Sequence, residues 1–214
     1  MKTVFLFLAS IFLFAACNST QKLTKVENVG IEALSNIASN SYIKLKAKTY
    51  ELEEHILIDN KENITIDGNG ATLIMQSLSD DVVLITDSKN ITLKNFKATH
   101  IEPQGPTGCT GNVLHIEGGA DILVESCELN GSGIVGIAAY KTENLKVLKN
   151  HIHKNSEYGI IYQGPSIEII GNTFENNSLG NLYFSYKSTA WPPEEKINSD
   201  QNKEGLKMSK NTFK

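Results

Sequence analysis

A short pattern recurs along most of this chain: an aliphatic residue, any residue, a second aliphatic residue and then, at a fixed distance, an asparagine. In four copies the asparagine lies five residues after the first aliphatic residue. These asparagines are Asn69, Asn150, Asn172 and Asn211. Two further copies, which begin at Ile91 and Ile122, carry Phe96 and Cys127 at the same position. The spacing is retained even where the asparagine is not, which indicates repeated units with one backbone geometry.

The repeated units predict a solenoid of about seven stacked coils. Their first aliphatic residues recur every 21 to 39 residues, at Ile43, Ile64, Ile91, Ile122, Leu145, Ile167 and Leu206. Self-similar units of about 20–50 residues are typical of repeat proteins, in which each unit buries its apolar face against its neighbours. The shortest units are too small for a pair of helices. They fit three short strands, and the alternation of Leu145, Lys146 and Val147 is typical of a strand with one buried side.

Two segments have the form of a known repeat. Residues 63–74 (NITIDGNGATLI) and 167–177 (IEIIGNTFENN) resemble the coils of right-handed parallel β-helix proteins in the pectate-lyase-like superfamily, and the resemblance extends from Ile31 to Phe213. It implies an all-β fold, a right-handed single-stranded parallel β-helix. In that fold the repeated asparagines form a row inside the solenoid, so all four are expected to be structural. A short helix within residues 29–38 is expected to cover the open first coil.

The first residues predict an export signal. An apolar run from Val4 to Phe14 follows a single lysine and leads into Ala15-Ala16-Cys17. This ending resembles the cleavage box of bacterial lipoproteins, which implies that Cys17 carries lipid and that the exported protein is anchored to the cell envelope, at the outer membrane of a Gram-negative bacterium. A plain secretory signal is the alternative. The expected divisions are a signal peptide over 1–17, a tether over 18–25 and a β-helix domain over 26–214.

The charge of the chain argues against a nucleic-acid partner. Its formal net charge is −4, whereas binding to a phosphate backbone needs a basic face. All 20 basic residues are lysine, and arginine is absent. The two cysteines beyond the leader, Cys109 and Cys127, either form a disulfide in an exported protein or remain free. The inward position of Cys127 in its repeat favours free thiols.

Outward side chains at the same position of successive coils form columns, and one column predicts weak catalytic candidates. It brings together Lys97, Glu128 and His151. Glu128 and His151 on adjacent coils would form a general acid–base pair, with Lys97 as electrostatic support. The alternative, which we favour, is a solvated polar strip without chemistry. The histidines lack a third ligand at motif spacing, so neither a metal nor another cofactor is expected.

A second column is predicted to bind ligand. It contains Glu117, Tyr140 and Tyr162 and runs beside His115, and its tyrosines offer the stacking and hydrogen-bonding surface that suits sugar rings. His153 is a further candidate for ligand binding. The place of Tyr162 depends on a strand whose register is ambiguous by one residue. Partial burial of the tyrosines beneath a loop is the alternative.

These features favour binding over catalysis. Enzymes of the pectate-lyase-like superfamily use arginine, or clustered aspartates on consecutive coils, and this chain offers neither set. The expected function is non-catalytic binding of a carbohydrate polymer by a lipoprotein that contacts the membrane through its lipid anchor. A polysaccharide lyase or glycoside hydrolase is one alternative. The other is a protein-docking scaffold that self-associates through its C-terminal coil, unless the insertion from Lys187 to Glu204 folds back over that end.

Overall fold

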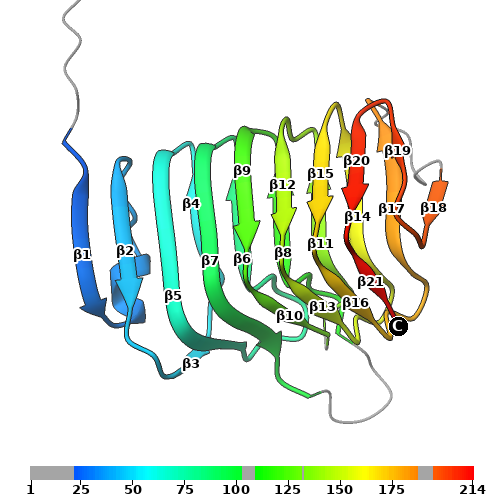
Figure 1. Ribbon diagram of the computed structural model, residues 1–214. Helices are drawn as coiled ribbons and strands as arrows, with labels where there is room; N and C mark the ends of the chain where they lie inside the picture. The colour runs from blue at the N-terminus through cyan, green and yellow to red at the C-terminus, as the bar shows by residue number, and fades with distance from the viewer. Residues whose placement is uncertain (1–21, 103–108, 132, 188–194) are drawn as a thin grey trace, which may run out of the picture.

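The chain forms a parallel β-helix. The computed structural model describes residues 22–102, 109–131, 133–187 and 195–214. The coils follow one another along a single axis, from β1 (Thr24–Val29) at one end to β20 (Leu206–Ser209) at the other (Figure 1). Their strands belong to a 14-stranded sheet, here called sheet A, and a 7-stranded sheet, here called sheet B. The prediction of an all-β solenoid with parallel strands is confirmed.

Sheet A has two arms joined by a bend. The first arm contains β1, β2 (Ser41–Leu45), the first halves of β5 (Glu62–Met75) and β7 (Lys89–His100), β9 (Ala120–Glu125), β12 (Leu145–Leu148), β15 (Ile167–Ile170), β20 and β19 (Asn202–Lys203). The second arm contains β3 (Thr49–Leu52), the second halves of β5 and β7, β10 (Glu128–Asn130), β13 (His151–His153), β16 (Thr173–Glu175) and β21 (Thr212–Phe213). Sheet B contains β4 (Ile56–Asp59), β6 (Val83–Thr86), β8 (Leu114–Glu117), β11 (Val135–Tyr140), β14 (Tyr158–Gly164), β17 (Gly180–Tyr186) and β18 (Glu195–Ile197).

Aliphatic residues of successive coils lie directly beside one another in the core. One column in the first arm runs, each residue paired with the next, through Ile66, Leu93, Val124, Val147 and Ile169. All five are at most 2% exposed. Removing apolar surface from water stabilises a fold by about 25 cal/mol per Å². This column and its counterparts in the second arm and sheet B therefore hold the coils together.

The first coil differs in register from the prediction. Ile43 pairs with Ile66, and Ser41 pairs with Ile64. The first inward position of this coil is thus a buried serine, and the predicted start at Ile43 is two residues too late. The aliphatic pattern was hidden there because a polar residue occupies an inward position.

The N-terminal end carries less helix than predicted. Only one 3-10 turn, η1 (Ile31–Leu34), forms within residues 29–38, and Leu34 is its buried residue. β1 adds an unpredicted strand in front of the first coil and pairs in parallel with β2. This strand includes the last two residues of the segment expected to be a tether. No helix in the described ranges is long and apolar enough to cross a membrane.

The insertion that follows β17 folds back over the last coil. β18 pairs antiparallel with β17, and β19 pairs antiparallel with β20. The backbone N–H of Met208 also donates to the carbonyl of Gln201 at 3.1 Å. The last strands of sheet B and of the first arm of sheet A are therefore covered by residues of the same chain, whereas β21 in the second arm pairs only with β16 among the described strands. The Trp191-Pro192-Pro193 segment lies outside the described residues.

A row of asparagine amides runs through the bend between the two arms of sheet A. Oδ1 of Asn172 accepts from the backbone N–H of Asn150 at 2.8 Å and from its side-chain amide at 3.0 Å. Oδ1 of Asn211 accepts from the backbone N–H of Asn172 at 2.9 Å and from its side-chain amide at 3.1 Å. At the first end of the row, the backbone N–H of Cys127 donates to Oδ1 of Asn150 at 2.8 Å. Buried polar groups in this bend are thus bonded, as stability requires.

Asn69 was expected in this row, and the structure places it elsewhere. In its coil the residue that pairs with Phe96 is Ala71, because the bend is two residues longer than in the next coil. Asn69 is exposed and has a φ of 54°, in the left-handed region that asparagine tolerates. Its side-chain amide donates to the carbonyl of Leu45 at 3.3 Å. A fixed spacing from the first aliphatic residue therefore misassigned this position.

Candidate functional site

The outer side of sheet B carries an apolar cluster that is separate from the core. Its buried members are Val135, Ala138, Tyr158 and Ile161, each at most 5% exposed. Ala138 and Ile161 alternate with inward residues of β11 and β14, so their side chains point out of the solenoid. Partly buried hydrophobic residues pack against the cluster. These four side chains are covered, so only the partly buried residues packed against them, Ile134, Tyr140 and Tyr183, can meet a ligand.

Aromatic rings lie within and beside this cluster, and we call His115, Tyr140, Tyr158 and Tyr183 the aromatic face. They lie on β8, β11, β14 and β17, which are consecutive strands of sheet B, or at the start of those strands. The rings of Tyr158 and Tyr183 stack with centroids 4.8 Å apart. His115 meets Tyr140 edge-on at 5.9 Å. Since His115, Tyr140 and Tyr183 remain partly exposed, a ligand can reach these rings.

Charged groups border the aromatic face. Oε1 of Glu117 accepts a hydrogen bond from Nζ of Lys141 at 2.6 Å. Nζ of Lys196 lies 5.5 Å from the ring centroid of Tyr158. Burial raises the pKa of Tyr140, and neighbouring carboxylates, Glu117 foremost, raise it further. The Tyr140 hydroxyl therefore stays protonated at neutral pH and can both donate and accept hydrogen bonds.

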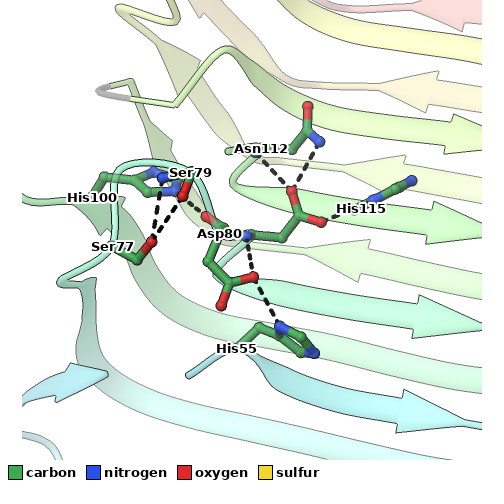
Figure 2. A network of polar contacts seen from close by, with 8 residues as sticks. His55, Ser77, Ser79, Asp80, His100, Asn112 and His115 are labelled. Carbon is green, nitrogen blue, oxygen red and sulfur yellow. Dashed lines mark hydrogen bonds and ion pairs between the residues drawn. The ribbon is translucent and has the colours of Figure 1, made fainter. Parts of the chain in front are cut away.

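Asp81, in the loop before β6, bonds both His115 and Asn112, which Figure 2 labels. Nδ1 of His115 lies 2.8 Å from Oδ2 of Asp81. Oδ1 of Asp81 accepts from the backbone N–H of Asn112 at 2.8 Å and from its side-chain amide at 2.9 Å. Burial favours the neutral form of Asp81, but its hydrogen bonds prevail and lower its pKa. The hydrogen bond to Asp81 raises the pKa of His115 against the effect of burial.

The adjacent Asp80 contacts histidines of neighbouring coils. Its Oδ1 lies 2.9 Å from Nδ1 of His55, and its backbone oxygen lies 2.7 Å from Nε2 of His100. Burial lowers the pKa of His100 and keeps it neutral at pH 7. Two successive aspartates thus tie consecutive coils together beside the aromatic face (Figure 2). In the part of the chain that the structure describes, no three histidine, cysteine, aspartate or glutamate side chains are grouped to hold a metal ion.

Of the predicted ligand-binding residues, Glu117, Tyr140 and His115 lie together and Tyr162 does not. Gln163 pairs with Tyr140 in place of Tyr162. Tyr162 is fully buried in the core, and its hydroxyl lies 2.7 Å from the carbonyl oxygen of Thr142. The prediction that Tyr162 points outward is therefore wrong by one residue of register. Tyr162 takes an inward position of β14, and Gln163 takes the outward one.

The predicted acid–base column is a network of ion pairs in the second arm of sheet A. Strand pairing places Glu128 between Lys97 and His151, as expected. Glu128 nevertheless bonds Lys97 at 2.7 Å and His153 at 3.1 Å, while His151 bonds Glu175 at 3.0 Å. Glu128 and His151 thus each have another partner. Burial works to raise the pKa of Glu128, but these two bonds lower it, so the carboxylate stays ionised.

His153 belongs to this network and not to the aromatic face. It lies on β13 of sheet A, is 7% exposed and stacks on His151 with ring centroids 4.0 Å apart. Burial lowers the pKa of His153, so the ring is neutral at pH 7. Nε2 of this neutral histidine is engaged by the ionised Glu128. The structure therefore does not bring His153 to the predicted ligand-binding column.

The coils pair in parallel one after another, and a row of asparagines runs inside them. A comparison with family models matches this architecture to a known family. The model described as "Right handed beta helix region" matches residues 54–214. The chain belongs to this family.

Among solved structures, this β-helix protein is similar to PfbA, a surface adhesin of Streptococcus pneumoniae, at 12% sequence identity and a TM-score of 0.47. The similarity covers 89% of this chain and 68% of that chain. No curated protein matches the sequence. The family accounts for the fold, and the function has to be argued from the surface of this β-helix protein.

Sequence reasoning missed Asp81, Asn112, Tyr158 and Tyr183. No periodic signal marks Asp81 or Asn112 in this β-helix protein, because both lie in loops of variable length between sheet A and sheet B. Tyr183 did have a signal. It pairs with Ile161 on the preceding coil, so an alignment of β14 with β17 places it outward.

Proposed function

We propose that the aromatic face binds a carbohydrate polymer without catalysis. The observation that carries this proposal is the apolar cluster on the outer side of sheet B, which places aromatic rings beside hydrogen-bonding groups. Tyrosine rings offer apolar faces to the C–H groups of a sugar, and their hydroxyls bond its oxygens. Glu117 and His115 add polar groups at the border of the same surface.

The arrangement suits an extended ligand. The four rings come from strands on successive coils, and neighbouring strands lie about 4.8 Å apart, so the face extends about 14 Å along the solenoid axis. A polymer lying along the axis meets several rings at once. Contacts at several points strengthen binding even where each single contact is weak.

A glycan array probed with the purified protein tests the proposal. We expect binding to a restricted set of glycans, which Tyr140→Ala and Tyr183→Ala each reduce about tenfold or more in calorimetric titration. The matched control is Tyr42→Ala, which removes an outward tyrosine from sheet A. If both face variants bind as tightly as the wild type, the aromatic face is not the binding surface.

The same samples separate binding from catalysis. A polysaccharide lyase creates double bonds that absorb ultraviolet light, and a glycoside hydrolase creates reducing ends. We expect neither product from polymers that the protein binds. Product that disappears in Glu128→Gln, His151→Asn or Lys97→Met would overturn the non-catalytic proposal and favour the enzyme alternative.

We further propose that the protein is a lipoprotein held at the outer membrane through Cys17. The support is the apolar leader and the residues before this cysteine, all of which lie outside the described residues. Metabolic labelling with an alkyne fatty acid is expected to mark the wild type. Cys17→Ala is expected to lose the label and to leave the membrane fraction. Label retained by Cys17→Ala would contradict the proposal.

Self-association through the C-terminal coil has less support. β18 and β19 already pair with the last strand of sheet B and with the last strand in the first arm of sheet A, which leaves only the two-residue β21 at this end. Sedimentation of the mature protein at rising concentration is expected to show a monomer. A concentration-dependent dimer that Lys196→Pro abolishes, by blocking the outer edge of β18, would instead favour a protein-docking scaffold.

A further inference from the structure

One ring nitrogen of His115, a member of the aromatic face, is not used by the fold. Nδ1 is engaged by Asp81 at 2.8 Å, and Figure 2 shows the rest of the ring, with Nε2, turned away from that carboxylate. Within the described ranges Nε2 has no hydrogen-bond partner, and 28% of the side chain is exposed. A directed polar atom beside Tyr140 is therefore available to a ligand.

The contacts of Asp81 determine which form of His115 is present. An ionised carboxylate only accepts hydrogen bonds, so Nδ1 must carry a proton. Because one oxygen of Asp81 takes both donors of Asn112, the other oxygen is directed at His115. Neutral His115 therefore has its proton on Nδ1 and an acceptor lone pair on Nε2.

We propose that Asp81 is a positioning residue of the ligand site, which fixes the tautomer of His115 so that Nε2 accepts a hydrogen bond from a sugar hydroxyl placed over Tyr140. This inference rests on the proposed function of the aromatic face. The rings of His115 and Tyr140 are perpendicular with centroids 5.9 Å apart, so a polar ring and an apolar ring lie within reach of one sugar unit. A pyranose unit has the matching chemistry, because C–H groups form its face and hydroxyl donors form its edge. The ligand class is thus a hydroxyl-bearing ring, and its hydroxyl is the donor.

The tautomer can be measured without any ligand. In ¹⁵N-labelled protein, at a pH above the titration of His115, the imidazole nitrogen shifts are expected to report the Nδ1–H tautomer. In Asp81→Asn the new amide oxygen keeps the donors of Asn112, so its NH₂ group faces His115 and favours the Nε2–H tautomer. Asp80→Asn is the matched control, because its amide oxygen can still accept from the backbone N–H of Asp81 while the charge beside His55 is removed, and the contact of Asp81 with His115 is expected to be kept.

Binding at a pH above the titration of His115, where Nε2 is an acceptor, gives the second readout, with soluble glucomannan, xylan and dextran as the probes. For any of these that binds, we expect Asp81→Asn to weaken binding about tenfold and Asp80→Asn to leave it unchanged. His115→Gln retains an acceptor oxygen and is expected to bind better than His115→Phe. If Asp81→Asn does not fold, the comparison of His115→Gln with His115→Phe still tests whether a hydrogen-bond acceptor at this position is needed for binding.

The outcomes separate the inference from the proposed function. A wild-type Nε2–H tautomer, or full binding by Asp81→Asn while Tyr140→Ala loses binding, overturns the role of Asp81 alone. Equal binding by His115→Phe and His115→Gln overturns it as well. If Tyr140→Ala and Tyr183→Ala also bind fully, the proposed function itself fails.

Discussion

Asp200 accepts hydrogen bonds from both donors of Asn211, the backbone N–H at 3.1 Å and the side-chain amide at 2.6 Å. Its carboxylate thus takes the place that the next asparagine would occupy and ends the asparagine row. The row has a direction, since each asparagine oxygen accepts from the coil before it. Its last member therefore needs an acceptor from outside the repeats.

Removal of this acceptor is expected to loosen the last coil. Asp200→Ala leaves two donors of Asn211 to water and is expected to lower the free energy of unfolding by about 1 kcal/mol, a modest amount because the site is exposed. Urea denaturation measures the change. Asp200→Asn keeps one acceptor oxygen and is expected to lie between the alanine variant and the wild type. Equal stability of all three proteins would contradict a capping role.

A larger loss is expected inside the row. Asn172→Ala removes the acceptor of two donors of Asn150 and is expected to lower the free energy of unfolding by about 3 kcal/mol, because Asn172 is 1% exposed. Asn69→Gly is the control. It removes an asparagine of the same sequence pattern but suits a positive φ, so a change within about 0.5 kcal/mol is expected. Similar losses for both variants would place Asn69 in the row.

Tyr162 and Tyr140 are expected to respond differently to loss of the hydroxyl. Tyr162→Phe leaves the buried carbonyl of Thr142 without its 2.7 Å bond, so unfolding free energy is expected to fall by about 2 kcal/mol with glycan binding unchanged. Tyr140→Phe is expected to weaken glycan binding and to leave stability within about 0.5 kcal/mol. Denaturation and calorimetric titration of both variants make the comparison. A binding defect in Tyr162→Phe would contradict its assignment to the core.

The pair of Asp81 and His115 gives stability a defined pH dependence. The pKa of His115 is raised above its ordinary 6.5, so its contribution is present below pH 6.5 and is lost as the pH rises through the raised value. The pKa of Asp81 is lowered below 3.8, so its contribution is present above pH 3.8 and is lost as the pH falls through the lowered value. The stability difference between wild type and Asp81→Asn is therefore expected to be largest between these limits.

Urea denaturation from about pH 3 to about pH 9 checks this dependence. Asp80→Asn, at the preceding residue, is the control, since its amide oxygen can keep the bond from the backbone N–H of Asp81 and the ionic partner that it loses is His55. A difference between wild type and Asp81→Asn that does not change with pH would rule out the ion pair as its source.

The thiol of Cys127 is expected to be unreactive in the folded protein. Cys109 and Cys127 are free and buried, and burial raises the pKa of Cys127 to about 12. The thiolate is the reactive form, so a disulfide reagent at about pH 8 is expected to label Cys127 only after unfolding. Peptide mapping distinguishes the two cysteines. Rapid labelling of Cys127 in the native protein would contradict its place inside the bend.

Much of the fold was predictable because each coil repeats the same inward positions. The pairing of Leu145 with Ile167 and of Ile167 with Leu206 follows directly from the repeat. The errors lie where a coil departs from it. Two extra residues in one bend displaced Asn69, and a serine at an inward position hid the register of Ile43.

The candidate site was predictable only in part. His115, Glu117 and Tyr140 were found because their strands, β8 and β11, keep the common register. In β14 every residue is buried, so alternation does not distinguish its two sides, and Tyr162 was assigned to the wrong one. The partner of Glu128 was also wrong, because strand register aligns Cα atoms and the side chain bonds a residue diagonally across, His153.

The amino-acid sequence by itself determined the winding of this protein, since apolar residues at alternate positions, repeated at coil length, can all be buried only by stacking in parallel. Tertiary structure alone decided the surface. Loops of unequal length bring Asp81 to His115, and no spacing along the chain encodes that meeting. Periodic burial acts on every coil alike, whereas a hydrogen bond from a loop to a strand of another coil depends on where that particular loop runs.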